Sequence, residues 1–405
     1  MGFVFHSEKS EAAFGNYNSI LIGDQASGMG GAYTSMIGDA SALAWYNPAG
    51  LIWLKGKSFS SAVGIYKKFD TVYGDLEDFT KASLRVNQGF FRSLPSTSGS
   101  VISYEDWKAA ISIVVPDYEN FQGDINNDNT NTSTLSYVDE SLWVGGALSK
   151  KISKTESLGV TAYYTARNLT KAVNDRTING SNFKIFNEQK TITENSIVFQ
   201  VGYMKFLPYS WKMGINLRFP SIPIAGQGTY FDSTVETGQT PTSHNYTGIA
   251  SRDHIPSKAS LGFSWEKPQM ITFSGDLSIY GHEKFSDMED YPDIAEIVEH
   301  RSIINAQGGI EIHAKPWLKV RLGGFTNFSS HETPDASLGK GQQDKVDQLG
   351  FSANMALTQG AMTYTFGGYY TGGRGKSVQR VNHQYQIVNR TSQVFTMLVA
   401  TSYFF

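Results

Sequence analysis

Residues 194–220 read ENSIVFQVGYMKFLPYSWKMGINLRFP, two alternating segments joined by a very short connection. In each segment one face is apolar and the opposite face is polar. The first apolar face consists of Ile197, Phe199, Val201 and Tyr203. The second consists of Trp211, Met213, Ile215, Leu217 and Phe219, with Lys212, Asn216 and Arg218 opposite. A period of two residues predicts β-strands, and the short connection predicts an antiparallel hairpin.

Two classes of protein use strands of this kind. In a transmembrane β-barrel the apolar face meets lipid and the polar face meets a lumen. In a soluble β-sandwich one face packs into the core and the other meets water, so its strands alternate as well. The alternation by itself therefore leaves both fold classes open.

The connections between strands separate the two classes. From residue 57 onward the alternation predicts fourteen strands, at about 57–67, 97–105, 107–115, 135–149, 157–167, 191–206, 210–219, 257–266, 270–281, 302–314, 317–327, 346–357, 361–371 and 391–405. Their connections are in turn short, such as 207–209, and long, such as 220–256. Tight turns on one side and long loops on the other are typical of outer-membrane barrels. We therefore predict an all-β, antiparallel transmembrane barrel of fourteen strands over residues 57–405.

The composition of the 405-residue chain excludes several other classes of protein. Charged residues make up 18% of the chain and aromatic residues 13%, a balance that suits a lipid-facing wall. A mean hydropathy of −0.28 argues against a bundle of membrane helices. The formal net charge of −3 gives no support to nucleic-acid binding. The absence of cysteine removes disulfides, thiolate metal sites and cysteine nucleophiles.

The last strand carries a more specific pattern. Its apolar and aromatic residues fall mostly on odd-numbered positions from Phe395 to the final residue, Phe405. A terminal aromatic residue on such a face resembles the C-terminal signature of bacterial outer-membrane proteins. The resemblance implies that the barrel insertion machinery recognises Phe405. We expect the odd-numbered side chains of this strand to face lipid.

Residues 1–56 alternate poorly and are rich in small side chains. Gly28, Gly30 and Gly31 could suggest a phosphate-binding loop, but their spacing lacks the dinucleotide fingerprint and no Walker lysine follows. Instead, GMGGAYTSMIGDASALAWYNPAGL, residues 28–51, resembles the N-terminal signature of the FadL-type outer-membrane transporters of long-chain fatty acids and other hydrophobic compounds.

The resemblance implies a division of the chain and a path for a ligand. Residues 1–56 would form a hatch that plugs the barrel, with Asn47, Pro48 and Ala49 in the hatch. Ligands would be captured between the connections 168–190 and 220–256, enter a lumenal pocket, and leave sideways through the wall. Such uptake is passive, because the ligand moves down its gradient.

Two sets of residues are candidates for this path. The aromatic residues Phe3, Phe5, Phe14 and Tyr17 could contact an apolar ligand, although packing of the hatch against the wall is the alternative. By resemblance, a gap in the wall would lie in the third strand. It would lie beside Pro116, which donates no backbone hydrogen bond, or at the Ala109–Ala110 pair.

No catalytic constellation stands out. The eight histidines form no zinc-protease motif and no Gly-x-Ser-x-Gly elbow occurs, so we expect neither an enzyme nor a cofactor. The run DINNDNT, residues 124–130, resembles the start of a calcium loop but lacks its glycine and its final glutamate. An Asx-rich turn is the alternative, and we expect no bound metal.

These observations place the protein in the bacterial outer membrane, in contact with lipid and lipopolysaccharide. The N-terminus lacks the basic and apolar regions of a signal peptide, so we expect a mature form restarted with methionine. Passive uptake of a hydrophobic small molecule or lipid, resembling a long-chain fatty acid, is the first hypothesis. The alternative is a FadL-like barrel that serves as a scaffold in secretion or envelope organisation, because its outer connections 116–134 and 328–345 are polar.

Overall fold

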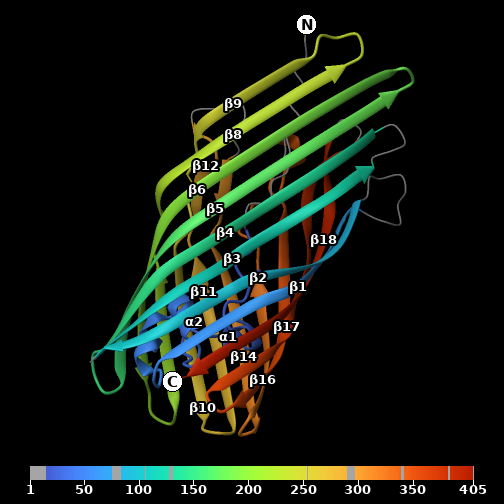
Figure 1. Cartoon of the computed structure of the whole chain (residues 1–405). Helices are drawn as coiled ribbons and strands as arrows, with labels where there is room; N and C mark the ends of the chain where they lie inside the picture. The colour runs from blue at the N-terminus through green and yellow to red at the C-terminus, as the bar shows by residue number, and fades with distance from the viewer. Residues whose placement is uncertain are drawn as a thin grey trace.

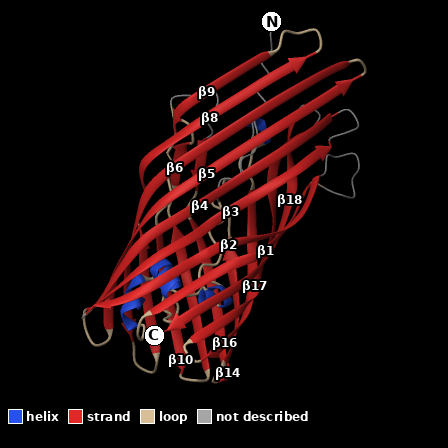
Figure 2. Cartoon of the chain, viewed as in Figure 1, coloured by secondary structure: helices blue, strands red, loops and turns tan. Residues whose placement is uncertain are grey.

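The chain closes into a single antiparallel β-barrel (Figures 1 and 2). The computed structural model describes residues 15–74, 84–104, 106–126, 131–252, 254–289, 297–338, 342–381 and 384–404. Its main sheet contains 16 strand segments, but β8 and β9 continue β7 and β10 along the same wall, which leaves 14 barrel strands. Pairing of β1 with β18 and of β5 with β6 completes the ring. The predicted fold class is therefore confirmed.

The strands vary widely in length. Their bounds are β1 (Ser58–Tyr73), β2 (Leu84–Tyr104), β3 (Trp107–Asn126), β4 (Asn131–Lys151), β5 (Glu156–Asn179), β6 (Asn182–Phe206), β7 (Trp211–Arg218), β8 (Ile222–Glu236), β9 (Thr242–Ala250), β10 (Lys258–Lys267), β11 (Ile271–Tyr280), β12 (Glu283–Ser286), β13 (Ile297–His300), β14 (Ile303–Lys315), β15 (Leu318–Asn327), β16 (Lys345–Gln359), β17 (Met362–Val381) and β18 (Gln384–Phe404). The short helices are α1 (Asp24–Gly28), α2 (Ala40–Tyr46), η1 (Pro48–Trp53) and η2 (Ala336–Leu338). None of the helices in the described ranges has the length and apolar character needed to cross a membrane.

The predicted strands end correctly at the tight turns but are too short at the opposite side of the barrel. Residues 168–190, expected to be a loop, form the outer half of the β5–β6 hairpin, whose ladder runs without a break to Asn179 and Asn182. Residues 220–256, also expected to be a loop, contain β8 and β9. These parts of the strands stand above the lipid, so both of their faces can be polar and the apolar alternation is lost.

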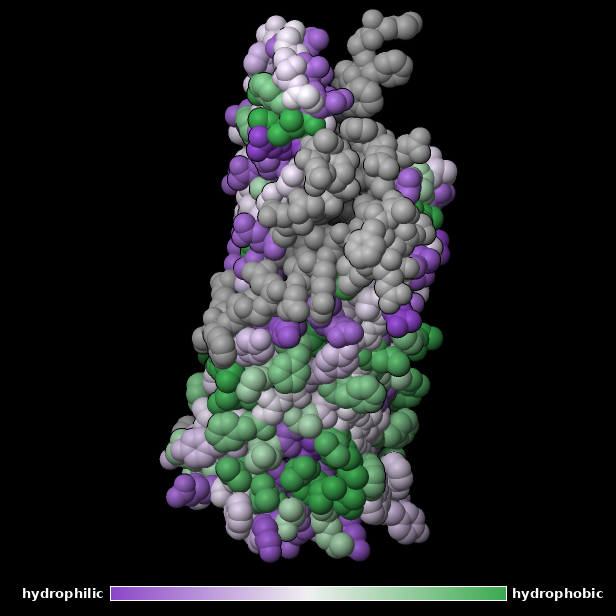
Figure 3. All heavy atoms as spheres, turned by 90° about the vertical axis from the view of Figure 1, so that its right-hand side faces the viewer, coloured by the Kyte–Doolittle hydropathy of each residue, from purple (hydrophilic) through white to green (hydrophobic). Residues whose placement is uncertain are grey.

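The outer face of the lower wall is apolar. On β18, Phe395, Met397 and Tyr403 are exposed, whereas Leu398 and Ala400 are buried, so the odd-numbered side chains point outward as predicted. Figure 3 shows hydrophobic side chains gathered over the lower half of the visible face. A belt of this kind is what a membrane-spanning barrel presents to lipid. Phe405 lies outside the described residues, and its neighbour Phe404 pairs with Ser58.

The N-terminal segment, residues 15–57, lies inside the lower part of this barrel (Figures 1 and 2). It hydrogen-bonds to strands on several sides of the lumen, including β1 through Ser60, β11 through Asp276 and β16 through Asn354. Capping side chains begin two of the short helices of this segment. Asp39 accepts backbone N–H groups at the start of α2, and Asn47 accepts one at the start of η1.

Candidate ligand pocket and N-terminal segment

Glycine allows the N-terminal segment to approach the wall closely. Gly30 and Gly31 have φ values of +67° and +82°, which side chains rarely adopt. The Gly30 N–H donates a 3.0 Å hydrogen bond to Ser352 Oγ on β16. A Cβ atom at Gly30 would lie 2.9 Å from the backbone of Gly324 on β15. The small residues noted in the sequence are therefore needed where two backbones meet.

Asn47 joins the segment to the wall on the opposite side of the lumen. Its side chain is fully buried, and its Nδ2 donates to the carbonyl oxygens of Thr34 at 2.7 Å and Tyr203 at 3.0 Å. Its Oδ1 accepts the Ala49 N–H at 3.1 Å. Pro48 and Ala49 are buried beside it. One amide thus serves two turns of the segment and one wall strand.

A buried ion pair lies in the wall beside α1. Glu311 on β14 accepts a 2.6 Å hydrogen bond from Arg321 Nε on β15. The same carboxylate accepts a 2.9 Å hydrogen bond from the Gln25 side chain. Both charges are therefore neutralised, and Gln25 ties the segment to them.

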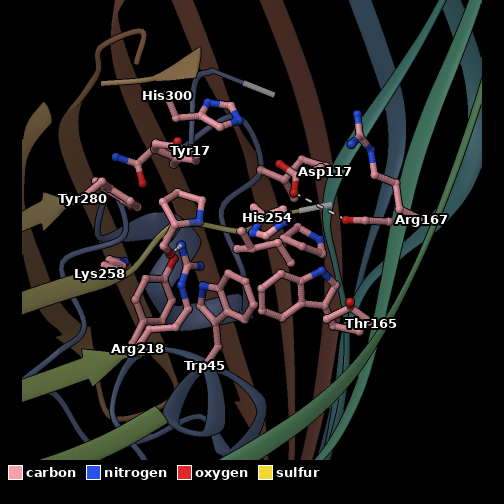
Figure 4. Close-up of a pocket in the computed structure, with 18 residues that line it drawn as sticks. Tyr17, Trp45, Asp117, Thr165, Arg167, Arg218, His254, Lys258, Tyr280 and His300 are labelled. Atoms are coloured by element: carbon pink, nitrogen blue, oxygen red, sulfur yellow. Dashed lines mark hydrogen bonds between the residues drawn. The ribbon is translucent and has the colours of Figure 1, made fainter. Parts of the chain in front are cut away.

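A pocket lies above the end of α2, between the segment and the inner wall (Figure 4). Trp45 and Trp143 pack edge to face below it, with ring centroids 5.1 Å apart. Tyr17 and Tyr280 stack at 4.4 Å on another side. Its volume of about 70 Å³ is room for a handful of water molecules, since one water needs about 10–15 Å³ on this measure. A larger ligand would have to displace side chains.

Three cations reach the pocket, and they differ in their partners. Arg167 is paired with Asp139 at 2.7 Å and with Glu194 at 3.3 Å. Within the described part of the chain, Arg218 and Lys258 make no ion pair with a carboxylate. Arg218 donates one hydrogen bond to the Pro256 carbonyl at 3.1 Å, and its buried Nε has no acceptor among the described residues. Lys258 lies 5.3 Å from the Tyr280 ring centroid.

The pocket therefore combines aromatic walls with two cations that make no ion pair among the described residues, although the Asp117 carboxylate also lines it. Aromatic rings bury apolar groups well, and a cation beside their faces is stabilised by the ring electrons. An arginine with a buried, unused N–H, such as the Nε of Arg218, can donate it to an anionic oxygen at little extra cost. The arrangement suits an amphiphile with a negatively charged head.

Scans against protein-family models and against curated proteins find no match to this chain. Solved structures, however, share the whole architecture. A Pseudomonas aeruginosa FadL homologue covers 96% of this chain and 100% of its own, with a TM-score of 0.68 and 13% identity. The P. putida toluene transporter TodX covers 95% and 98%, with a TM-score of 0.67 and 12% identity.

The chain has the fold of the FadL-type transporters. A third similar structure, the CymD monoaromatic hydrocarbon channel, covers 96% of this chain and 99% of its own, with a TM-score of 0.64 and 11% identity. Because the sequence identities are this low, the similarity establishes a shared fold and nothing more.

The FadL-type barrel brings some of the candidate residues together and separates others. Tyr17 and Pro116 both line the pocket. The predicted hatch residues lie where the N-terminal segment packs against the wall, and not in the pocket. They are Asn47, Pro48, Ala49, Gly30 and Gly31. Phe3, Phe5 and Phe14 lie outside the described residues.

The wall beside Pro116 has an interrupted ladder. Strands β2 and β3 pair from Tyr104–Trp107 to Thr97–Val114, and no further pair joins them in the described residues. Beyond that point β2 continues on β1 and β3 continues on β4, across a register shift between Val114 and Asp117. Ala109 and Ala110, by contrast, lie in intact ladders on both sides.

The segment DINNDNT does not form a complete site in the described structure. Asp124, Ile125 and Asn126 belong to β3, and residues 127–130 lie outside the described ranges. Across the residues that are described, no cluster of three or more histidines or carboxylates could hold a metal ion.

Sequence reasoning missed the two unpaired cations and the tryptophans. Arg218 and Lys258 are 40 positions apart but form the last rung of the β7–β10 ladder. Arg218 stands on the polar face of its predicted strand, where a lumenal arginine is unremarkable. A signal was available in Pro220, Pro223 and Pro256, which interrupt the two strands just beyond these cations.

His331, in the outer connection above the pocket, should make that connection sensitive to acid. It is buried, contacts Gly15 and stacks on His300 with ring centroids 5.5 Å apart. Burial lowers the pKa of His331 to about 4, below the roughly 6.5 of an unfolded chain. Between these two values the unfolded form binds more protons, so stability falls as pH falls.

We expect the free energy of opening that protects the amides of residues 328–335 from hydrogen exchange to fall by on the order of 3 kcal/mol between pH 7 and pH 4. The rates are first corrected for the pH dependence of intrinsic exchange. His331→Gln should flatten this dependence. His244→Gln, at an exposed histidine on β9, is the matched control and should leave it unchanged. If the His331→Gln variant kept the pH profile of the original protein, His331 would not be the group that makes this connection sensitive to acid.

Proposed function

We propose that this chain is an outer-membrane channel for the passive uptake of hydrophobic small molecules with an anionic head, such as long-chain fatty acids. The observation that carries the proposal is the pocket itself. It joins the unpaired cations Arg218 and Lys258 to an aromatic lining, directly above a closely packed N-terminal segment. The FadL-type fold supports the same class of function, since two of the similar structures are described as a toluene transporter and a monoaromatic hydrocarbon channel.

The head group distinguishes this cargo from a plain hydrocarbon. The buried Arg218 and the half-buried Lys258 make no ion pair among the described residues, and beside a purely apolar ligand they are costly because nothing would replace their lost hydration. A carboxylate would offset that cost through charge-assisted hydrogen bonds. The tryptophan and tyrosine rings would then cover the first part of the chain.

The N-terminal segment acts as a plug in this proposal. A barrel of fourteen strands is wide enough for an aqueous lumen unless something fills it. Residues 21–54 are largely buried, and the Asn47 amide and the Gly30 backbone fix them to opposite sides of the wall. Axial movement of a ligand would require this packing to come apart.

The proposed exit is the interrupted ladder between β2 and β3. Pro116 lines the pocket and stands just beyond the last β2–β3 rung, so pocket and interruption are adjacent. Proline has no N–H to leave unpaired, which lowers the cost of a break in the wall. Uptake through it would need no energy source, because the ligand moves down its gradient.

A disulfide at the lower end of this interruption tests the exit. Ser96 and Val115 are the first residues beyond the last paired rung, Thr97–Val114, so Ser96→Cys with Val115→Cys should bridge the two strands at the edge of the break when oxidised. We expect uptake of radiolabelled palmitate by cells that depend on this protein to fall about 10-fold on oxidation, with palmitate binding to purified protein unchanged.

The chain has no native cysteine, so the readout is free of competing thiols. Ile102→Cys with Ala109→Cys, in the intact part of the same ladder, is the matched control and should transport normally. Undiminished uptake by the oxidised Ser96–Val115 pair would refute the lateral exit. Absence of palmitate binding in every variant would refute the channel and favour a scaffold.

A further inference from the structure

The wall has a second interruption, on the strand pair that carries the unpaired cations. The β7–β10 ladder ends at Arg218–Lys258, and the β8–β9 ladder begins only at Gln227–Ala250. Residues 219–226 stay on β6 throughout, through the bond from Phe219 N–H to the Phe199 carbonyl and the pairing of β8. On the other side, the described residues 251–252 and 254–257 form no ladder with β7 or β8, although the Ser257 carbonyl still accepts the Gly281 N–H beyond β11. We call this interruption the upper seam.

Separate hydrogen bonds, rather than a continuous ladder, cross the described part of the upper seam. They include the Ser221 N–H to the Ile255 carbonyl at 3.0 Å, the Ile255 N–H to Ser221 Oγ at 2.8 Å and, at the lower edge, Arg218 Nη2 to the Pro256 carbonyl at 3.1 Å. A longer bond of 3.4 Å joins the Ser251 N–H to the Gly226 carbonyl. Pro220, Pro223 and Pro256 border the seam and carry no N–H, so the sequence removes donors that lipid could not satisfy.

The two faces of the upper seam have different surroundings. On the inside, His254, Ile255 and Pro256 line the pocket. On the outside, Phe219, Ile222 and Ile224 are 49%, 55% and 55% exposed, although they are large and apolar. A single stretch of backbone therefore separates the pocket from an apolar outer rim.

The outer rim stands at the height of the outer lipid boundary. Phe219 follows Trp211, the first residue of β7 beside the tight β6–β7 turn, by eight positions. At about 3.4 Å per residue and a tilt near 40°, these positions rise roughly 20 Å, close to the height of the apolar band of a barrel. The seam thus opens toward the outer half of the bilayer.

We infer that the upper seam is a second lateral portal, through which the tail of an anionic amphiphile passes between the outer leaflet and the pocket. The inference rests on the proposed ligand pocket and adds a route that bypasses the outer loops. Arg218 and Lys258 stand at the lower edge of the seam, so they would hold the head inside. The tail would lie between Ile255 and the rim formed by Phe219 and Ile222.

A disulfide across the upper seam tests the portal. Ser221→Cys with Ile255→Cys should lock it when oxidised, because the backbones of these residues already touch. The protein is reconstituted in phospholipid vesicles, and a diazirine-bearing palmitate is supplied either dissolved in the bilayer or bound to albumin in the water. Photolabelling of the pocket peptides around Trp45 and Trp143 is followed over time by mass spectrometry.

We expect oxidation to slow labelling by the bilayer-dissolved probe about 10-fold, while labelling by the albumin-bound probe keeps its rate. The reduced form of the same protein shows that the variant folds. Leu217→Cys with Ala259→Cys, a rung of the intact β7–β10 ladder, is the matched control and should not respond to oxidation.

Three results would overturn the inference, and they are distinguishable. Equal labelling before and after oxidation would show that the seam stays shut to the ligand. If only the Ser96–Val115 disulfide slowed labelling by the bilayer-dissolved probe, the ligand would pass between bilayer and pocket only through the break between β2 and β3. Failure of both probes to label the pocket in any variant would remove the proposed function, and the portal with it.

Discussion

Replacing Arg218 and Lys258 together by methionine should lower the affinity of the pocket for palmitate by about 100-fold or more. Each cation would lose a charge-assisted hydrogen bond to the carboxylate, worth about 1.5–3 kcal/mol. The affinity for palmityl alcohol should change by less than about threefold, because its hydroxyl gains little from either charge. Methionine keeps most of the apolar volume, so the aromatic lining should stay in place.

The measurement is calorimetric titration of the purified protein with both ligands. Lys212→Met is the matched control, since Lys212 also lies on β7 but is paired with Glu266 at 2.6 Å and does not line the pocket. Equal losses for the acid and the alcohol would show that the two cations shape the pocket rather than bind a head group.

Asn47→Ala should release the N-terminal segment from its place in the lumen. The substitution leaves the carbonyls of Thr34 and Tyr203 and the N–H of Ala49 without their partner. Each buried polar group left in this state costs about 1–3 kcal/mol, so the packing should weaken by about 3 kcal/mol or more. We expect larger and noisier single-channel conductance in planar bilayers, together with faster proteolysis of residues 15–57.

Asn245→Ala on the exposed part of β9 is the control and should leave both readouts unchanged. If proteolysis shows that the segment is released while the conductance stays at the original level, the segment does not plug the barrel. An unchanged rate of proteolysis would instead show that Asn47 is not what holds it.

The lipid-facing part of the wall could be predicted from the sequence because a membrane imposes a strict pattern. Residues such as Phe199, Val201 and Leu217 must be apolar where they meet lipid, and their lumenal neighbours need not be. Above the lipid this constraint ends. The outer halves of β5 and β6 therefore mix polar residues with a few buried apolar ones such as Leu169 and Val173, and their hydrogen-bonded register is invisible to hydropathy.

The pocket was harder to foresee, because it is assembled from distant parts of the chain. Tyr17 was a candidate only as one of several N-terminal aromatic residues. Its partner Tyr280 lies 263 positions away by their residue numbers, and only the closure of the barrel brings the rings together. Arg218 and Lys258 likewise become neighbours through strand register, which depends on how many residues the β8–β9 extension absorbs.

The interlocking of the N-terminal segment with the wall also bears on how the molecule is built. The segment precedes β1 in the chain, yet it contacts strands from β1 to β18, and the ring is completed only when these two terminal strands pair. Gly30 sits against Gly324 with no room for a side chain to slide past. The packing favours an order of assembly in which the sheet first packs around the N-terminal segment, and β1 and β18 pair last. The segment would then act as a template on which the barrel closes. A chain that lacks the segment should therefore pair β1 with β18 more slowly.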